Sequence, residues 1–201
     1  MGKIEEKKRE KKEALLLSAF QLFTEKGIEE TSISEIAMGA KLAKGTFYLY
    51  FKDKFDIRDE LIAMQASALF DIAHEELKLY ETENWNSLEE GIVALADHIA
   101  DRLNENQMLL RFIAKNLSWG IFSNIRIAGL DNRNCMDIFE ELLERSGRQF
   151  RQKHLMIYMI VELVNATCYN VILKRQPVTL EELKPDLNTA ICNLIHQFEI
   201  N

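Results

Sequence analysis

Glycine, proline and cysteine are all scarce in this chain of 201 residues. It contains 8 Gly and 2 Pro, whereas all-β sandwiches and barrels need many more turn-forming residues. No run of alternating polar and apolar residues lies between turn signals, so the pattern does not indicate β-strands. The hydrophobic fraction of 47% is ample for a packed core. We therefore expect an all-α protein.

The three cysteines, Cys135, Cys168 and Cys192, are odd in number and far apart. This arrangement excludes a disulfide framework or a zinc ribbon and favours reduced, buried thiols. Of the four histidines, only His74 has a carboxylate three residues before it, so the pair of Glu-x-x-His motifs of a di-iron bundle is missing. Nucleophile-elbow and phosphate-binding glycine motifs are also missing. We expect no metal, no cofactor and no catalytic residues, and hence a protein that is not an enzyme.

The N-terminal residues lead into a charged segment and not into an apolar core, so we expect no signal peptide and a cytoplasmic protein. The apolar run 154–173 is long enough for a membrane span. However, Glu162 and three polar residues interrupt it, and a central carboxylate is costly in lipid. A helix buried by its own domain on one side and by a partner subunit on the other is the favoured interpretation.

The net charge of −7 is distributed unevenly along the chain. Residues 1–54 carry 11 Lys and Arg against 9 Asp and Glu, whereas residues 55–201 carry 14 against 23. Between Ile36 and Lys52 there are three lysines and no acidic residue. A basic N-terminal segment followed by an acidic remainder indicates that the N-terminal part faces a polyanion. For the charged run 7–12, a solvated helix start is favoured over an arm that tracks DNA.

Apolar periodicity, with start and stop signals, predicts a succession of helices. Ser32 with Glu35, and Ser87 with Glu90, have capping-box spacing. Asp53 is the expected N-cap of a long helix, and Pro185 is expected in the first turn of the last one. The expected helices cover residues 3–26, 33–40, 44–50, 54–79, 88–103, 104–117, 119–128, 131–146, 153–174 and 185–199.

The segment 31–54 is the most informative part of the chain. Two short helices separated by a tight turn, with a longer helix before them, are typical of a helix-turn-helix. Phe47 and Phe51 hold the second short helix to the core, which leaves lysine, threonine and tyrosine side chains outside. Lysine donates to phosphates or guanine edges, threonine contacts bases, and tyrosine hydroxyls reach phosphates. Gly45 lets the start of the helix approach a duplex closely.

These residues resemble the N-terminal signature of TetR-family transcriptional regulators. The matching positions cover about a quarter of the chain, and their joint spacing is highly specific. They are Ala19–Phe23 with Gly27, Thr31–Ala37, Lys44–Thr46, Tyr48–Phe51 and Lys54. The turn departs from the family pattern, since Lys41 and Ala43 stand where glycine and serine are common. Lysine at a left-handed position adds strain, and alanine lacks the capping hydroxyl.

The resemblance implies a homodimer whose recognition helices enter successive major grooves of a palindromic operator. It also implies a repressor with a helix-turn-helix domain at 1–53 and a helical domain at 54–201 that binds a small ligand and releases the DNA. The resemblance further implies that the bound ligand displaces the helix 54–79 and so changes the separation of the two recognition helices. The DNA-contacting residues expected on this basis are Ser32, Lys44, Gly45, Thr46, Tyr48, Tyr50, Lys52 and Lys54.

The second domain offers a ligand pocket and a dimer interface only by inference. The expected ligand-binding residues are Met64, Phe112, Trp119, Tyr158, Glu162, Asn165 and Tyr169. The expected dimer residues, on two helices that would form a four-helix interface, are Leu155, Met159, Leu187, Ile191, Leu194 and Phe198.

Three polar residues in the apolar helix, Glu162, Asn165 and Asn170, each need a partner, and a pocket, a dimer mate or a local hydrogen bond would serve equally well. A pocket that contains Glu162 would favour a cationic ligand. Two other classes stay open for the whole chain: a helical protein-interaction module, and a small-molecule-binding or catalytic bundle without specific DNA binding.

Overall fold

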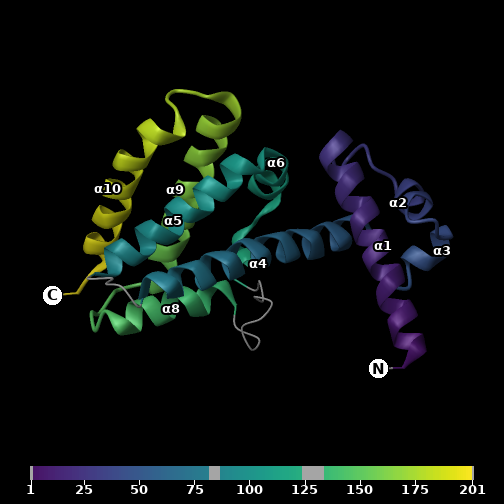
Figure 1. Ribbon diagram of the computed structural model, residues 1–201, viewed down its shortest axis with the longest axis horizontal. Helices are drawn as coiled ribbons and strands as arrows, with labels where there is room; N and C mark the ends of the chain where they lie inside the picture. The colour runs from purple at the N-terminus through teal and green to yellow at the C-terminus, as the bar shows by residue number, and fades with distance from the viewer. Residues whose placement is uncertain (1, 82–86, 124–133, 201) are drawn as a thin grey trace. The chain divides into compact units, whose positions relative to one another are not determined.

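The computed structural model describes residues 2–81, 87–123 and 134–200. These residues form ten helices and no β-strand, and an isolated antiparallel bridge joins Phe150 to Glu199. The all-α fold expected from the sequence is confirmed (Figure 1). The chain divides into two compact units, residues 1–64 and 65–201, and the division falls inside the long helix α4 (Lys54–Glu81). The domain boundary expected after residue 53 lies at the start of this helix, and so it precedes the division between residues 64 and 65.

The first unit contains α1 (Lys3–Lys26), α2 (Ile33–Gly39), α3 (Lys44–Phe47) and the start of α4. Local signals set the starts of these helices as expected, but α3 ends at Phe47 and not at residue 50. α1 ends at Gly27, whose φ of 92° suits glycine. Ser32 and Glu35 form a complete capping box at the start of α2. Asp53 Oδ1 accepts hydrogen bonds from the backbone N–H groups of residues 55 and 56 at distances of 2.8 and 2.9 Å.

The core of the first unit lies where α1, α2 and α3 pack together. Its fully buried side chains include Leu15, Ile36 and Phe47. α1 and α2 approach so closely that a Cβ at Gly39 would clash with the hydroxyl of Ser18. That hydroxyl donates a 2.9 Å hydrogen bond to the carbonyl of Ile36, so the glycine leaves room for a buried bond between the two helices.

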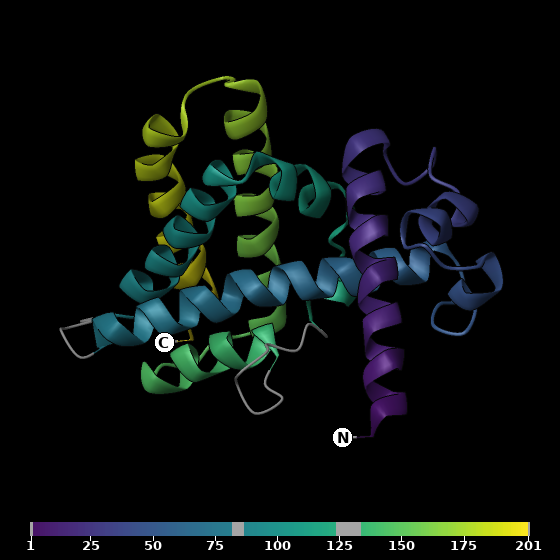
Figure 2. The same cartoon turned by 45° about the vertical axis from the view of Figure 1, so that its right-hand side comes forward.

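The second unit contains the rest of α4 and six further helices in the described part of the chain. α9 packs against α10, α5 and α6, and α5 also packs against α8 and α10 (Figures 1 and 2). The helices are α5 (Leu88–Glu105), α6 (Gln107–Asn116), α7 (Trp119–Phe122), α8 (Cys135–Arg145), α9 (Lys153–Lys174) and α10 (Leu180–Phe198).

Three starts in the second unit differ from the prediction. α8 begins at Cys135 and not at residue 131, because Asn134 and Asp137 form a complete capping box. α10 begins at Leu180 and not at Pro185, because Thr179 and Glu182 form a complete capping box. The expectation that Pro185 lies in the first turn is therefore wrong: the proline lies inside the helix. α6 begins after Asn106, whose side chain accepts a hydrogen bond from the backbone of Leu109. Residues 124–128 and 131–133 of two expected helices lie outside the described residues.

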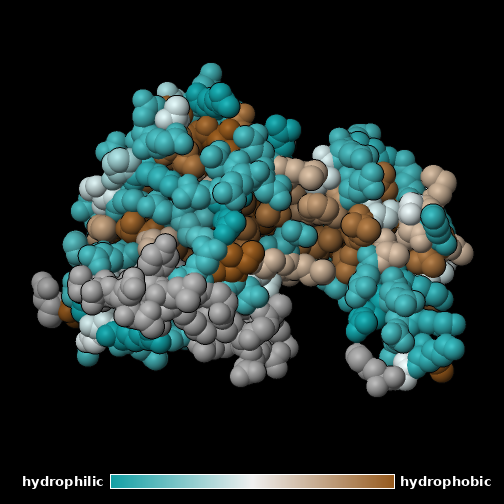
Figure 3. Space-filling view, in the orientation of Figure 1, coloured by the Kyte–Doolittle hydropathy of each residue, from teal (hydrophilic) through white to brown (hydrophobic). Residues whose placement is uncertain are grey.

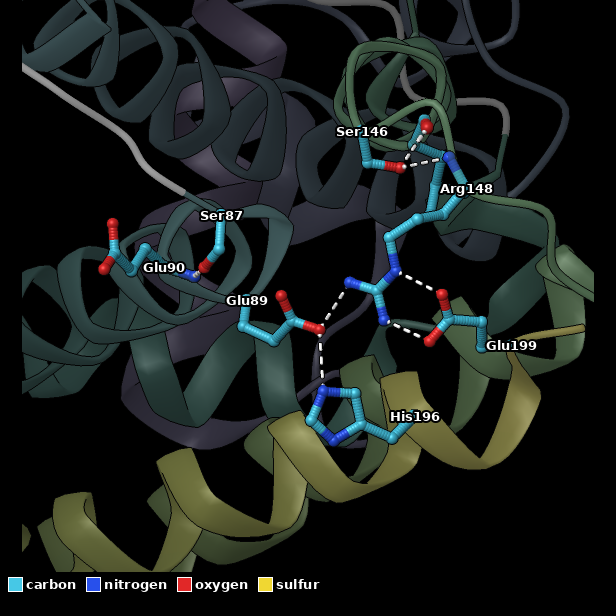
Figure 4. A network of polar contacts seen from close by, with 8 residues as sticks. Ser87, Glu89, Glu90, Ser146, Arg148, His196 and Glu199 are labelled. Atoms are coloured by element: carbon cyan, nitrogen blue, oxygen red, sulfur yellow. Dashed lines mark hydrogen bonds and ion pairs between the residues drawn. The ribbon is translucent and has the colours of Figure 1, made fainter. Parts of the chain in front are cut away.

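A polar network joins three distant parts of the second unit (Figure 4). Arg148, between α8 and α9, donates to Glu199 just after α10 through both Nε and Nη2, at 2.7 and 2.6 Å. Its third nitrogen donates to Glu89 near the start of α5 at 2.6 Å. Nε2 of His196 lies 3.0 Å from the same carboxylate oxygen of Glu89. The network holds the ends of α5 and α10 to the loop that leads into α9.

All three cysteines are free thiols, and burial raises the pKa of Cys168 to about 11. α9 is long and apolar enough to cross a membrane by length and composition, and a third of its apolar window is buried within the chain. One such helix is weak evidence for a membrane span, because core helices of soluble proteins have the same composition.

Candidate nucleic-acid interface and internal cavity

The turn between α2 and α3 has a backbone held by two close hydrogen bonds. The N–H of Lys41 donates to the carbonyl of Met38 at 2.9 Å, and that of Leu42 donates to Ala37 at 2.8 Å. Lys41 has a φ of 57°, so the expected left-handed lysine is confirmed. Ala43, the N-cap of α3, makes no side-chain capping bond. The turn therefore lacks both of the aids, a glycine and a hydroxyl, that would relieve strain there.

α3 is a single turn with one buried and one exposed side. Phe47 is fully buried and makes ring contacts with Phe51 and Tyr48, both at 5.6 Å between centroids. Lys44 and Gly45 are exposed, and 54% of Tyr48 is accessible. A Cβ at Gly45 would meet no atom within 4 Å. Nothing inside the chain therefore requires glycine at this position.

The other expected DNA-contacting residues lie around this turn and differ in their exposure and in their hydrogen bonds. Thr46 and Tyr50 are partly buried, and Lys52 is exposed. The hydroxyl of Ser32 is engaged with Glu35 inside the capping box. Lys54 is also engaged within the chain, as described next.

The ammonium group of Lys54 is bound by the loop between α1 and α2. It donates 2.9 Å hydrogen bonds to the carbonyls of Ile28 and Glu29, and the Glu29 carboxylate lies 3.5 Å away. These carbonyls follow the end of α1, where backbone acceptors need partners. In this arrangement Lys54 joins the start of α4 to the loop.

The carboxylates beside the turn are held in their charged form. A hydrogen bond from Lys26 lowers the pKa of Glu35 to about 2, aided by the backbone and hydroxyl of Ser32. Backbone hydrogen bonds, first from Asp56 and then from Phe55, lower the pKa of Asp53. Glu35 is paired with Lys26. Lys44 is exposed, and no ion pair joins it to another residue in the described part of the chain.

The second unit contains a partly open cavity of about 80 Å³ among α4–α9. Fifteen of its sixteen described lining residues are apolar, and the exception is Asn165. Phe70, Phe122 and Phe139 form a cluster on its wall, with ring centroids between 5.6 and 6.5 Å apart. The described residues contain no group of three or more His, Cys, Asp or Glu that could hold a metal ion.

Of the seven expected ligand-binding residues, the structure brings Asn165 to this cavity. Phe112 is buried elsewhere, and Met64 and Tyr158 are exposed. Glu162 and Tyr169 are partly buried and do not line the cavity. Trp119 stacks on Phe122 with 5.5 Å between centroids, so it lies one ring away from the cavity.

Sequence reasoning missed the aliphatic residues of the lining, such as Leu95, Ile113 and Val161. In sequence they look like ordinary core positions, and only the packing of six helices shows that they leave a space.

The expected dimer residues fall into two groups. Leu155 and Met159 on α9 are 42% and 37% exposed. Leu187, Ile191 and Phe198 on α10 are buried inside the subunit. The accompanying Leu194 is partly buried. Figure 3 shows apolar surface at several places on the second unit, in contrast to the hydrophilic N-terminal half of α1.

The geometry is that of a helix-turn-helix unit followed by a helical unit that contains a cavity. Residues 15–61 match the family described as "Bacterial regulatory proteins, tetR family". The repressor BepR of Brucella suis biovar 1 (strain 1330) is 32% identical over 91 residues, which are 45% of this chain and 44% of BepR. The chain thus spans about half the length, or less, of the curated relatives it matches.

Solved structures show the same fold along nearly the whole chain. A TetR-family transcription regulator from Shewanella sp. PV-4 is similar with a TM-score of 0.68 at 17% identity, covering 95% of this chain and 99% of that one. FadR from Bacillus subtilis, solved in complex with stearoyl-CoA, is similar with a TM-score of 0.59 at 20% identity, covering 89% and 96%. Residues 15–61 are thus similar to the TetR family of bacterial regulatory proteins, and nearly the whole chain shares the fold of solved TetR-family structures.

Proposed function

We propose that this protein is a DNA-binding transcriptional repressor that binds a palindromic operator as a homodimer and is released by a small-molecule effector. The observation that carries the proposal is the exposed side of α3. Lys44 and Tyr48 are presented there by a helix that the buried Phe47 holds in place. The open space around Gly45 is room for a partner outside the chain. Positive and aromatic groups around a close-approach glycine suit the edge of a duplex.

The repressor role is supported by similarity to BepR, which is named a transcriptional repressor. A homodimer is supported by the exposed apolar side chains on α9, Leu155 and Met159. Two copies related by a twofold axis would bury this surface on each other. A twofold dimer would also match a palindromic operator, whose half-sites lie about one helical turn apart.

The effector role is supported by the cavity in the second unit. Pockets with apolar walls and few polar groups are typical of small-molecule sites. FadR of Bacillus subtilis, which has the same fold, was solved with stearoyl-CoA. α4 contributes Leu69 and Phe70 to the cavity wall and begins within the first unit, so it provides a covalent link from an occupied cavity to the DNA-binding unit.

Two glycine substitutions test the DNA-binding face. Gly45 and Gly120 are both exposed residues of short helices, and a Cβ at Gly120 would have Ser118 Oγ as its nearest neighbour at 4.0 Å. Alanine at either position should therefore keep the fold, with a free energy of unfolding unchanged or about 0.5–1 kcal/mol higher. We expect Gly45→Ala to weaken operator binding more than tenfold and Gly120→Ala to leave it unchanged. The measurement is fluorescence anisotropy on the upstream intergenic DNA of the protein's own gene, titrated with salt.

Scrambled duplex serves as the control for sequence selectivity, and a steep linear loss of log affinity with log salt is the sign of phosphate contacts. Equal DNA affinity of the Gly45→Ala variant and the unmodified protein would contradict the proposed face. Absence of binding to every duplex even at low salt would remove the proposed function and favour a helical interaction module.

A further inference from the structure

The cavity of the second unit is lined almost entirely by hydrocarbon. No described side chain that lines it carries a charge. A charged group placed there would lose its hydration without gaining a partner, which costs far more than burying a neutral group. Glu162, the residue that would have selected a cation, is not among the lining residues. The walls therefore favour an occupant that is uncharged where it lies in the cavity.

Asn165 is the polar exception in the lining. A comparison with its polar neighbours on α9 shows that its amide can pair with an occupant of the cavity. The Asn170 amide donates to the carbonyl of Ala166 at 3.1 Å, and the Thr167 hydroxyl donates to that of Leu163 at 2.7 Å. Each of these side chains donates a hydrogen bond to its own helix. The Asn165 amide makes no side-chain hydrogen bond with any described residue, and it lies on the cavity wall. An amide offers both a donor and an acceptor, so it can pair with one hydroxyl or carbonyl group.

The size of the cavity limits the shape of the occupant. Its volume of about 80 Å³ is smaller than the roughly 150 Å³ of an engineered apolar cavity that holds benzene. Close packing of protein interiors makes displacement of the surrounding helices costly. The cavity is partly open, so a straight hydrocarbon chain, which is narrower than a ring, can enter it end-on without being enclosed along its whole length.

We propose that the effector carries a slender, uncharged hydrocarbon chain and one hydroxyl or carbonyl group that pairs with the amide of Asn165. The inference rests on the proposed function, since it names the chemical class of the effector that releases DNA. Asn165 is then the specificity-determining residue of the site, and the aliphatic walls supply the remaining affinity through burial of the chain.

Calorimetry with three probes of equal chain length tests the chemistry of the site. The probes are 1-hexanol, hexylammonium and hexanoate, added at pH 7 to the full-length protein. We expect 1-hexanol to bind and both charged probes to bind at least tenfold more weakly. Emission of Trp119, which stacks on the cavity residue Phe122, gives a second readout when Trp85→Phe removes the other tryptophan.

A matched pair of variants tests the role of Asn165. Asn165→Leu replaces the amide at the cavity wall with a hydrocarbon that has the same number of side-chain heavy atoms. Asn170→Leu makes the same change on the exposed side of α9. We expect Asn165→Leu to weaken 1-hexanol binding about fivefold, the effect of removing one hydrogen bond, and Asn170→Leu to leave it unchanged. Equal binding by the two variants would overturn the assignment of Asn165.

The outcomes separate this inference from the proposed function. Charged probes that bind as tightly as 1-hexanol, or no binding of 1-hexanol by a protein that still binds its operator, would overturn the inference and leave DNA binding intact. Operator affinity that is unchanged by saturating 1-hexanol would overturn the effector role of this class. Binding of 1-hexanol by a protein that binds no duplex would support the chemistry of the cavity and remove the proposed function.

Discussion

Lys54 shows how one side chain can stabilise the helix-turn-helix unit through contacts within the chain. Its ammonium group donates to the carbonyls of Ile28 and Glu29, and so it connects the start of α4 to the loop after α1. A group engaged in this way contributes to the stability of the unit that presents α3. Lys44, in contrast, is exposed on the face proposed to contact DNA.

The difference between these two lysines gives a prediction at the residue scale. We expect Lys54→Met to lower the free energy of unfolding by about 1–2 kcal/mol, because it removes two charge-assisted hydrogen bonds. We expect it to leave the salt dependence of DNA binding unchanged. Lys44→Met should do the opposite: stability is kept, and the slope of log affinity against log salt falls by about 0.9 for each phosphate that the lysine no longer neutralises. Denaturant unfolding and anisotropy at several salt concentrations measure both quantities. If Lys54→Met reduced the slope and left stability unchanged, Lys54 would be a phosphate-binding residue.

At the scale of elements, the network around Arg148 links α5, the loop before α9 and the end of α10 (Figure 4). Burial raises the pKa of Glu89, but the hydrogen bond and the charge of Arg148 outweigh burial, so the net shift is downward. The hydrogen bond from Arg148 also lowers the pKa of Glu199. A carboxylate with a lowered pKa in the folded state stabilises the fold above its unfolded pKa, and this stabilisation is lost as the pH falls.

The pH dependence of unfolding tests this network. The contribution of Glu89 and Glu199 should be fully present at neutral pH and decline as the pH falls below about 4.5, the unperturbed value for glutamate. Arg148→Met should lower the free energy of unfolding at pH 7 by about 1–2 kcal/mol. The difference between the variant and the unmodified protein should shrink toward pH 3. Chemical denaturation at pH 7, 5 and 3 gives the comparison, and a difference that stays constant with pH would rule out the network as its origin.

At the scale of the whole molecule, assembly depends on which apolar side chains remain outside the folded subunit. Met159 on α9 is 37% exposed, whereas Ile191 on α10 is fully buried. A substitution at Met159 should therefore change the assembly of subunits, and a substitution at Ile191 should change the stability of one subunit. The exposed methionine belongs to the proposed interface between subunits, and the buried isoleucine belongs to the core of one subunit.

We expect Met159→Glu to convert a dimer into a monomer at micromolar concentration, since it places a charge in an apolar interface. Met108→Glu is the matched control, because Met108 is exposed on α6 outside the proposed interface. Ile191→Ala should instead lower the free energy of unfolding by about 2–4 kcal/mol through the cavity that it leaves. Sedimentation velocity and denaturant unfolding separate the two effects. A Met159→Glu protein that sediments as the unmodified dimer would place the interface elsewhere.

Sequence alone was most informative where the signal is local. The capping pair Ser32–Glu35, the stop at Gly27 and the left-handed position of Lys41 are all present as expected. Each depends on the chemistry of residues within one turn of chain. The start of α10 was also encoded locally, by Thr179 and Glu182, but Pro185 suggested a later start. A proline signals a helix boundary only on average, and here the capping box determined it.

By itself, the sequence determined the all-α class, most helix bounds and the exposed side of α3, because periodicity, caps and a buried phenylalanine pair are properties of neighbouring residues. Only the tertiary structure decided three further points. The apolar stripe of α10 around Ile191 is buried within one subunit. Lys54 binds a loop 25 residues earlier in the chain. Asn165 lines a cavity, whereas Glu162 does not. An amphipathic stripe records that a face is to be buried, and the partner that covers it depends on packing between distant helices.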